Sequence, residues 1–178
     1  AAAIWPAFGN NASLRETIFT MLMSVALASS LNILLGYTGY VNFGSIVFFG
    51  LGGYLGFYTV SALGWHLLLA VPIGGVAAAT LALLLGSAVL RLRGAYFALA
   101  TIGINEAMKA LVINLDFLGG PTGMNLNFSI YQEYGGPAQA LWLTYWALAV
   151  ITLLVIVGSY LVKKSKFGLG LMAIREDE

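Results

Sequence analysis

The sequence predicts an all-α, polytopic transmembrane helical bundle, and three observations predict it. Apolar residues make up 60% of the chain and charged residues only 8%, with a mean hydropathy of +0.91. The apolar residues gather in stretches of roughly 20, the length at which an α-helix crosses a hydrocarbon core. Glycine and isolated polar residues interrupt several of these stretches. A soluble core could not cover so much apolar surface, so we expect residues 1–178 to form a single transmembrane domain, as a fragment of a longer chain.

Five apolar stretches are expected to span the membrane. The second carries Gly52 and Gly56, a spacing that lets another helix approach closely. The third contains Pro72 and the pair Gly74-Gly75, where a kink or a tight crossing is expected. In chain order, the expected spans are 17–35, 41–63, 65–90, 95–115 and 141–162.

Two segments are expected to lie outside the membrane. Residues 116–139 contain Gly119-Gly-Pro-Thr-Gly123 and are too polar and turn-rich to span, so they are expected to form an extracytoplasmic loop. Residues 163–178 have charge at both ends and an apolar middle, which predicts a small cytoplasmic helix. This helix either anchors at the membrane surface or inserts into a groove of a cytoplasmic partner, and composition alone favours anchoring. The orientation follows from the excess of basic residues on one side, since only Arg15 lies on the other. The basic residues that share the cytoplasmic side are Arg91, Arg93, Lys163, Lys164, Lys166 and Arg175.

The segment 31–54 is apolar enough for a membrane, yet glycine and polar residues break it. Irregular backbone at membrane depth survives only inside protein or along a wet cavity, so this segment is a candidate pathway element. Its hydrogen-bonding groups either contact a polar solute or hold neighbouring helices together, and for each residue taken alone packing is favoured. The residues concerned are Asn32, Gly36, Gly39, Asn42, Gly44 and Ser45.

The fourth expected span carries two ionisable residues, Glu106 and Lys109, next to Asn105. Their i, i+3 spacing places both on one helix face. Ionisable groups inside a span are costly and usually face protein or water, which favours a contact on a translocation route. The alternative is a Glu–Lys pair that reaches toward the outer headgroups. Glu106 is the stronger functional candidate, because its shorter side chain reaches the headgroups poorly.

Several function classes are excluded or lack support. The chain has no Cys and one His, so no thiolate metal site, cysteine nucleophile or metal cluster can be assembled, and no cofactor is expected. A Gly-rich loop ending in Lys-Ser or Lys-Thr is missing, so the chain does not bind ATP by that route. A net charge of +1 gives no indication of a nucleic-acid partner. No catalytic constellation therefore appears in the sequence.

Three motifs in the same order along the chain carry a resemblance to a known family. They are Leu31-Asn-Ile-Leu-Leu-Gly-Tyr-Thr-Gly-Tyr-Val-Asn-Phe-Gly-Ser45 continuing to Tyr54, then Arg91-Leu-Arg-Gly-Ala-Tyr-Phe-Ala98 with Glu106 and Gly119-Gly-Pro-Thr-Gly123, then Lys166-Phe-Gly168 with Ala173-Ile-Arg-Glu-Asp-Glu178. From about Leu31 onward the chain resembles the membrane permeases of branched-chain amino acid ABC importers, specifically the M-type subunit.

The resemblance implies partners and site residues. It implies a second related permease subunit, cytoplasmic ATP-binding subunits, an extracytoplasmic solute-binding protein, and a place in the bacterial plasma (inner) membrane. A solute path is then expected along Asn32, Gly36, Gly39, Asn42, Gly44, Ser45, Asn105 and Glu106. The cytoplasmic helix is expected to dock on an ATPase through Lys166, Phe167, Gly168, Ala173, Ile174, Arg175, Glu176 and Asp177. The chain departs from the family pattern at Leu169 and Leu171, which concerns the details of docking. Family members are longer, so this fragment alone is not expected to transport.

The sequence is compatible with three functional hypotheses. The first is an ATP-driven importer permease for branched-chain amino acids, urea or short amides. The second is an ion-coupled secondary transporter or channel-like protein, which the broken span and the pair Glu106 and Lys109 would also fit. The third is a helix-packing subunit without a solute path.

Overall fold

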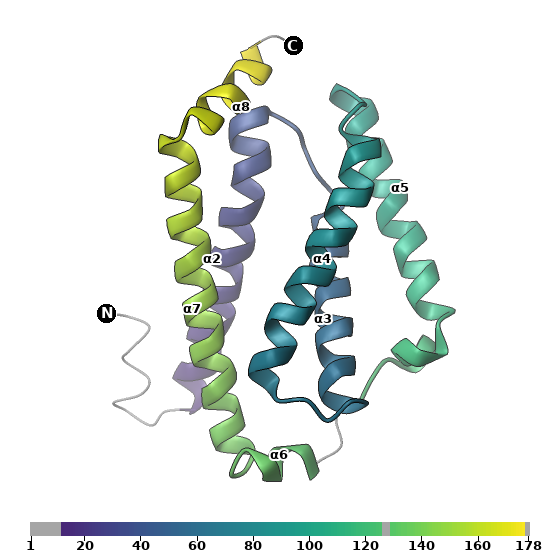
Figure 1. The fold of residues 1–178 in the computed structure, drawn as a ribbon, viewed down its shortest axis with the longest axis vertical. Coiled ribbons are helices and arrows are strands. Elements are labelled where there is room, and N and C mark those ends of the chain that lie inside the picture. The colour runs from purple at the N-terminus through teal and green to yellow at the C-terminus, as the bar shows by residue number, and fades with distance from the viewer. Residues whose placement is uncertain (1–11, 126–128, 177–178) are drawn as a thin grey trace. The chain divides into compact units, whose positions relative to one another are not determined.

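The computed structural model describes residues 12–125 and 129–176, which form helices joined by short turns, with no strand among them. This confirms the all-α helical prediction (Figure 1). The α-helices are α2 (Ala12–Thr38), α3 (Ser45–Ser61), α4 (Leu67–Val89), α5 (Gly94–Ile113), α6 (Ser129–Glu133), α7 (Pro137–Lys164) and α8 (Lys166–Glu176). The expected loop 116–139 contains α6 and two 3₁₀ turns, η1 (Asp116–Leu118) and η2 (Gly120–Thr122).

Among the described residues, α2, α4, α5 and α7 are long and apolar enough to cross a membrane. Large apolar side chains point outward from them; Leu83 on α4 is 75% exposed and Leu153 on α7 is 61% exposed. Such outward apolar faces suit contact with lipid, because a helix that is apolar all round must be buried in protein or in a membrane. The helix α3 is apolar but has only 17 residues.

The chain divides into two compact units. The first unit comprises residues 1–39 and 131–178, and the second comprises residues 40–130. The first unit contains α2, α7 and α8, and the second contains α3, α4 and α5. Each unit is described by itself below.

In the first unit, α2 and α7 lie side by side and run in the same direction (Figure 1). Hydroxyl groups of α7 donate to carbonyl oxygens of α2: Thr152 Oγ1 to Leu22 at 3.3 Å and Ser159 Oγ to Ser29 at 3.3 Å. The two bonds are seven residues apart on each helix and progress in the same direction along both, as expected for parallel helices. Small hydroxyl residues commonly join membrane helices in this way, since they allow close approach and satisfy their own polarity.

An aromatic cluster fills the starting ends of α2 and α7. The Arg15 guanidinium lies 5.2 Å from the centre of the Trp142 ring. Tyr145 is fully buried and packs edge-to-face on Trp142 and Trp146, with ring centres 5.5 and 5.6 Å apart. Tyr145 thus belongs to the core of this unit, whereas aromatic residues at the start of a span are typical of the membrane interface.

In the second unit, α3 and α4 cross at small residues. A Cβ added at Gly52 would lie 3.1 Å from the Gly74 carbonyl oxygen, and one at Gly56 would lie 3.2 Å from that of Ala70. The backbones therefore approach too closely for side chains at these positions. This confirms the close approach predicted from the spacing of Gly52 and Gly56, and α4 continues as a helix through Pro72.

Residues 39–44 form the break that the sequence predicts within 31–54. Gly39 has a φ of 76°, in the left-handed region that favours glycine, and its N–H donates to the Leu35 carbonyl at 3.1 Å as α2 ends. The next helix starts only at Ser45, four residues later than the expected span 41–63. The break is therefore confined to a short non-helical stretch, and Gly36 lies within regular helix.

Candidate functional site

The stretch 40–44 is held against α5. The Phe43 N–H donates to Thr101 Oγ1 at 3.2 Å, and the same hydroxyl donates to the Ala98 carbonyl at 2.8 Å. Tyr40 and Phe97 stack at a ring-centre distance of 4.9 Å. Thr101 is only 5% exposed, and its hydroxyl provides the Phe43 N–H, which lies outside a helix, with a hydrogen-bond acceptor.

Asn42 and Gly44 complete this turn. The Asn42 side-chain oxygen accepts from the Gly44 N–H at 2.8 Å, so it supports the backbone just before α3 begins. A Cβ at Gly44 would lie 3.3 Å from the Thr101 carbonyl oxygen, which explains glycine at this buried position. Ser45 is the first residue of α3 and is half-buried. The geometry favours the packing interpretation for Asn42 and Gly44.

The other three predicted path residues near the break belong to the first unit. Asn32, Gly36 and Gly39 lie on α2 or directly after it. The Asn32 side chain lies over Gly36, so that a Cβ on Gly36 would collide with its amide oxygen. Of the predicted cluster, Asn42, Gly44 and Ser45 lie together in the second unit.

A cavity of about 480 Å³ lies between α3 and α5 in the second unit. Two of the predicted path residues, Asn105 and Glu106, line it together with Lys109. Its volume falls within the roughly 300–1,000 Å³ that is usual for small-molecule sites. The remaining lining residues are Ile46, Val47, Gly50, Leu51, Tyr54, Met108, Val112 and Ile113.

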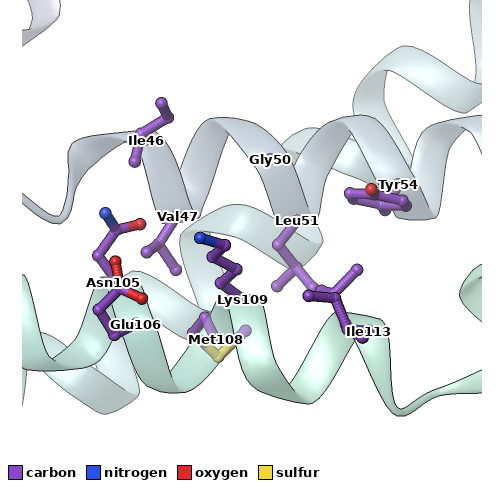
Figure 2. Close-up of a pocket in the computed structure, with 11 residues that line it drawn as sticks. Ile46, Val47, Gly50, Leu51, Tyr54, Asn105, Glu106, Met108, Lys109 and Ile113 are labelled. Carbon is purple, nitrogen blue, oxygen red and sulfur yellow. The ribbon is translucent and has the colours of Figure 1, made fainter. Parts of the chain in front are cut away.

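Figure 2 shows that the cavity has a polar and an apolar part. The side chains of Asn105, Glu106 and Lys109 extend from α5 toward α3. Leu51 and Ile113 line the other end, toward Tyr54. A carboxylate, an ammonium group and an amide therefore face a wall of aliphatic side chains.

The segment 31–54 was predicted as a candidate pathway element, but none of the α3 residues that line this cavity was named among the candidates. Val47, Leu51 and Tyr54 recur at spacings of three and four, which places them on one helix face. Gly50 leaves space on that face, because a Cβ added there would meet no heavy atom within 4 Å. The periodicity was available in the sequence, but in an apolar helix it does not distinguish a cavity wall from a packed face.

The Gly119–Gly123 motif forms a compact turn at the end of α5. Gly119, Gly120 and Gly123 all have positive φ, and the Thr122 hydroxyl donates to the Gly119 carbonyl at 2.9 Å. Leu118 is 1% exposed, and Phe117 packs edge-to-face on Tyr58 at 6.0 Å. These contacts fasten the ends of α3 and α5 beyond the cavity.

The residues expected to dock on an ATPase lie on α8, which contacts α2 and α7 (Figure 1). Ser165 separates α7 from α8; its hydroxyl donates to the Val162 carbonyl at 2.8 Å and accepts from the Gly168 N–H at 3.1 Å. Gly168 is buried, and a Cβ there would collide with the Val162 carbonyl oxygen. The expected docking residues Lys166, Phe167, Gly168, Ala173, Ile174, Arg175 and Glu176 all fall within α8, and Asp177 lies outside the described residues.

Comparison with known proteins identifies the family. The sequence matches the family described as "Branched-chain amino acid transport system / permease component" over residues 14–178. The chain belongs to this permease family.

Two relatives of the permease are similar over 135 residues. The high-affinity branched-chain amino acid transport system permease protein LivM of Escherichia coli (strain K12) is 32% identical, and the alignment covers 70% of this chain and 29% of that protein. The LivM protein of Salmonella typhimurium (strain LT2) is 31% identical with the same coverage. The aligned region thus spans less than a third of the curated relatives. No solved structure matches the chain.

In this permease, the α3–α5 cavity offers groups that can bind a small polar molecule. Within residues 12–125 and 129–176, no three His, Asp or Glu side chains gather in a way that could hold a metal ion. The cavity instead presents one carboxylate and one ammonium group beside apolar side chains. This arrangement can bind and orient a small polar molecule.

Proposed function

We propose that this permease chain is part of a subunit of an ATP-driven importer that carries branched-chain amino acids or related small polar solutes across the bacterial inner membrane. The observation that carries the proposal is the family match over residues 14–178. The cavity between α3 and α5 supports it, because it combines charged and apolar groups in one site. No finding favours an ion-coupled transporter or a channel.

We propose that the partners are a second permease subunit, cytoplasmic ATP-binding subunits and a solute-binding protein outside the membrane. The sequence contains no phosphate-binding Gly-rich loop, which supports the assignment of ATP hydrolysis to partner subunits. The helix α8 is the proposed contact with these ATPases. The packing of α8 on α2 and α7 supports this role, because a movement of α8 would be transmitted directly to these membrane helices.

The parallel packing of α2 and α7 supports a topology in which α3 also crosses the membrane. Parallel helices begin on the same side, so the chain between them must cross an odd number of times. The helices α4 and α5 account for two crossings, and α6, with 5 residues, is too short to make one. The third crossing then falls to α3, whose 17 residues reach the lower end of the usual range.

This topology places the basic residues on one side. The connector with Arg91 and Arg93 and the end of α7 with Lys163 and Lys164 share the side on which α2 ends. Arg15, at the start of α2, lies on the opposite side. By the positive-inside rule the basic side is cytoplasmic, so charge and helix packing support the same orientation.

The proposed solute path runs past the α3–α5 cavity. Asn105 and Glu106 line it. Asn42 and Gly44 precede α3, which forms the other wall, and Ser45 is the first residue of α3. Asn32, Gly36 and Gly39 remain proposed path residues on α2.

Reconstitution of the complete importer tests the proposed function. The full-length permease, its partner permease, the ATPases and the solute-binding protein would be placed in proteoliposomes, with leucine uptake measured with and without ATP. We expect uptake only with ATP. Uptake driven by an ion gradient alone would overturn the proposal in favour of a secondary transporter.

A further inference from the structure

We propose that the end of α7 binds an anionic phospholipid of the cytoplasmic leaflet. The ammonium groups of Lys163 and Lys164 contact the lipid phosphate, and the exposed apolar face of α7 lies along an acyl chain. The inference adds a lipid site to the proposed importer function, and it uses the proposed orientation only to name the leaflet.

The first support is a line of exposed side chains on α7 that ends at a lysine. They follow one another at spacings of three and four residues, which places them on one helix face. From its first to its last residue the line rises about 21 Å, so it reaches from the hydrocarbon to the headgroup region. Its apolar part suits an acyl chain and its lysine suits a phosphate. The side chains of this line are Val150, Leu153, Val157, Tyr160 and Lys164.

The second support is the direction of the Lys164 side chain. Its Nζ lies 4.6 Å from the centre of the Tyr160 ring, about one turn earlier on α7. The lysine therefore extends back along the helix, toward the apolar line, and not away from it. Tyrosine is typical of the headgroup level of a membrane, because its ring has an apolar body and a polar tip. The ammonium group thus lies at the depth expected for lipid phosphates.

The third support is positive charge without an acidic residue nearby in the sequence. Lys163 and Lys164 are exposed, and the exposed Lys166 follows directly after the turn at Ser165. The sequence from 134 to 175 contains no Asp or Glu. An anion for these lysines is therefore not supplied by α7 itself.

The helices that pack on α7 carry their carboxylates far from these lysines. The acidic residue of α2 is Glu16, which lies beside Arg15 at the starting ends of α2 and α7, away from Lys164. The acidic residue of α8 is Glu176, ten residues after Lys166 and thus about 15 Å along the helix. The anion that fits these lysines is a lipid phosphate, since basic residues next to a membrane helix attract anionic headgroups.

The lipid site is distinct from the proposed ATPase contact. Lys163 and Lys164 belong to α7, whereas the residues proposed to dock on the ATPases lie on α8 or directly after it. The turn between the two helices is held by Ser165, whose bonds go to the Val162 carbonyl and the Gly168 N–H. Changes to the two lysines therefore test lipid binding and leave the proposed docking residues unaltered.

Quenching by brominated lipids tests the inference in the assembled full-length importer. A fluorophore is attached at Leu153→Cys, in a permease free of other cysteines, and the importer is placed in nanodiscs of phosphatidylcholine and phosphatidylglycerol. Acyl chains of one lipid at a time are brominated, and competition gives the relative affinity. We expect phosphatidylglycerol to be preferred about tenfold or more, since each lysine near a lipid surface contributes roughly fivefold, the equivalent of about 1 kcal/mol.

Two results of this experiment would overturn the inference. Equal affinities for the two lipids would show that the lysines do not select an anionic headgroup. Quenching by neither lipid would show that protein, from another subunit or another part of the chain, covers this face of α7.

Variants assign the charge. Lys164→Gln should lower the preference about fivefold, and Lys163→Gln together with Lys164→Gln should bring the two lipids close to equal affinity. The matched control is Arg91→Gln, which removes an exposed positive charge on the same proposed side and should keep the parental preference. A loss in Arg91→Gln as large as that in Lys164→Gln would reveal a general attraction of the basic side and would overturn the site.

Salt separates headgroup charge from acyl-chain fit. We expect the preference to fall as NaCl is raised from about 0.05 M to about 0.5 M, because exposed charges are screened over this range. The same preference at both concentrations would contradict contact between the ammonium groups and the phosphate. ATP-driven leucine uptake is measured separately, so failure of the lipid site leaves the importer proposal standing.

Discussion

Gly74 is the position at which a single methyl group would cost the most in the α3–α4 crossing. A Cβ added there would collide with the Gly52 carbonyl oxygen, whereas one added at the neighbouring Gly75 would meet nothing within 4 Å. The two glycines adjoin in sequence and lie in the same helix, yet only one makes the close approach. This contrast gives a matched pair of variants.

We expect Gly74→Ala to lower the stability of the full-length protein in detergent by about 1–3 kcal/mol, because backbone atoms at the crossing must move apart. Gly75→Ala should be neutral or stabilising by roughly 0.5–1 kcal/mol, because alanine favours the helix. Thermal unfolding of both variants measures the difference. Equal melting temperatures would show that the crossing is looser than described.

At the residue scale, the sequence predicted features that depend on local spacing. Gly52 and Gly56 were identified from their separation, and Glu106 and Lys109 were placed on one face by theirs. The sequence could not distinguish the two roles of Asn42. The same amide side chain can accept a hydrogen bond from the Gly44 N–H or bind a solute. The partnership of Thr101 with Phe43 was also not predictable, since 58 residues separate them.

At the scale of elements, the turn between α7 and α8 is built to hold α8 in one direction. Ser165 bonds to both sides of the turn, and Gly168 lies against the Val162 carbonyl. Gly170 on the same helix has open space beside it. The direction of α8 therefore depends on Gly168 and not on Gly170.

We expect Gly168→Ala to displace α8 and to weaken its association with the ATPase subunits by about tenfold, the equivalent of ~1.4 kcal/mol. Gly170→Ala should leave association unchanged. The difference is measured by the amount of ATPase that co-purifies with the full-length permease, or by the affinity of the ATPases for immobilised permease. Full association of the Gly168 variant would remove α8 as the coupling element while leaving the permease fold intact.

Helix content followed from hydropathy, but helix ends did not. The helix α3 starts four residues after the start of the expected span 41–63, because Asn42 and Gly44 form a turn before it. Hydropathy does not detect such a turn. The helix α7 begins at Pro137, before the expected 141, since proline is well accommodated at the first helical position. Side-chain and backbone capping, not apolarity, decides these boundaries.

At the scale of the whole molecule, parallel packing of α2 and α7 is the observation from which the proposed topology follows. The contacts that establish it join residues about 130 apart, such as Thr152 with Leu22 and Ser159 with Ser29. No local pattern in the sequence announces such a pairing. The division into two units was unpredictable for the same reason.

Cysteine labelling tests this topology, and this part of the chain contains no native Cys to interfere. In a full-length permease free of other cysteines, we expect Val41→Cys and Leu92→Cys to react with a membrane-impermeant maleimide only from the cytoplasmic side. Leu63→Cys should react only from outside, because α3 lies between Val41 and Leu63. All three positions are exposed. Labelling of Val41→Cys and Leu63→Cys from the same side would show that α3 does not cross.

The cavity between α3 and α5 lies on the proposed solute path, and a larger side chain at Gly50 would fill part of it. Gly50 lines the cavity, and a Cβ added there would meet no heavy atom within 4 Å; Gly53, on the same helix, has the same open space but does not line the cavity. Gly50→Phe and Gly53→Phe therefore add the same group to the same helix, one inside the cavity and one outside it.

ATP-driven leucine uptake by the reconstituted importer carrying Gly50→Phe, with Gly53→Phe as its matched control, shows whether solute passes through this cavity. We expect Gly50→Phe to lower uptake at least tenfold in a complex that still assembles with its ATPases, and Gly53→Phe to transport as the parent does. Parental uptake by Gly50→Phe would contradict a solute path through this cavity.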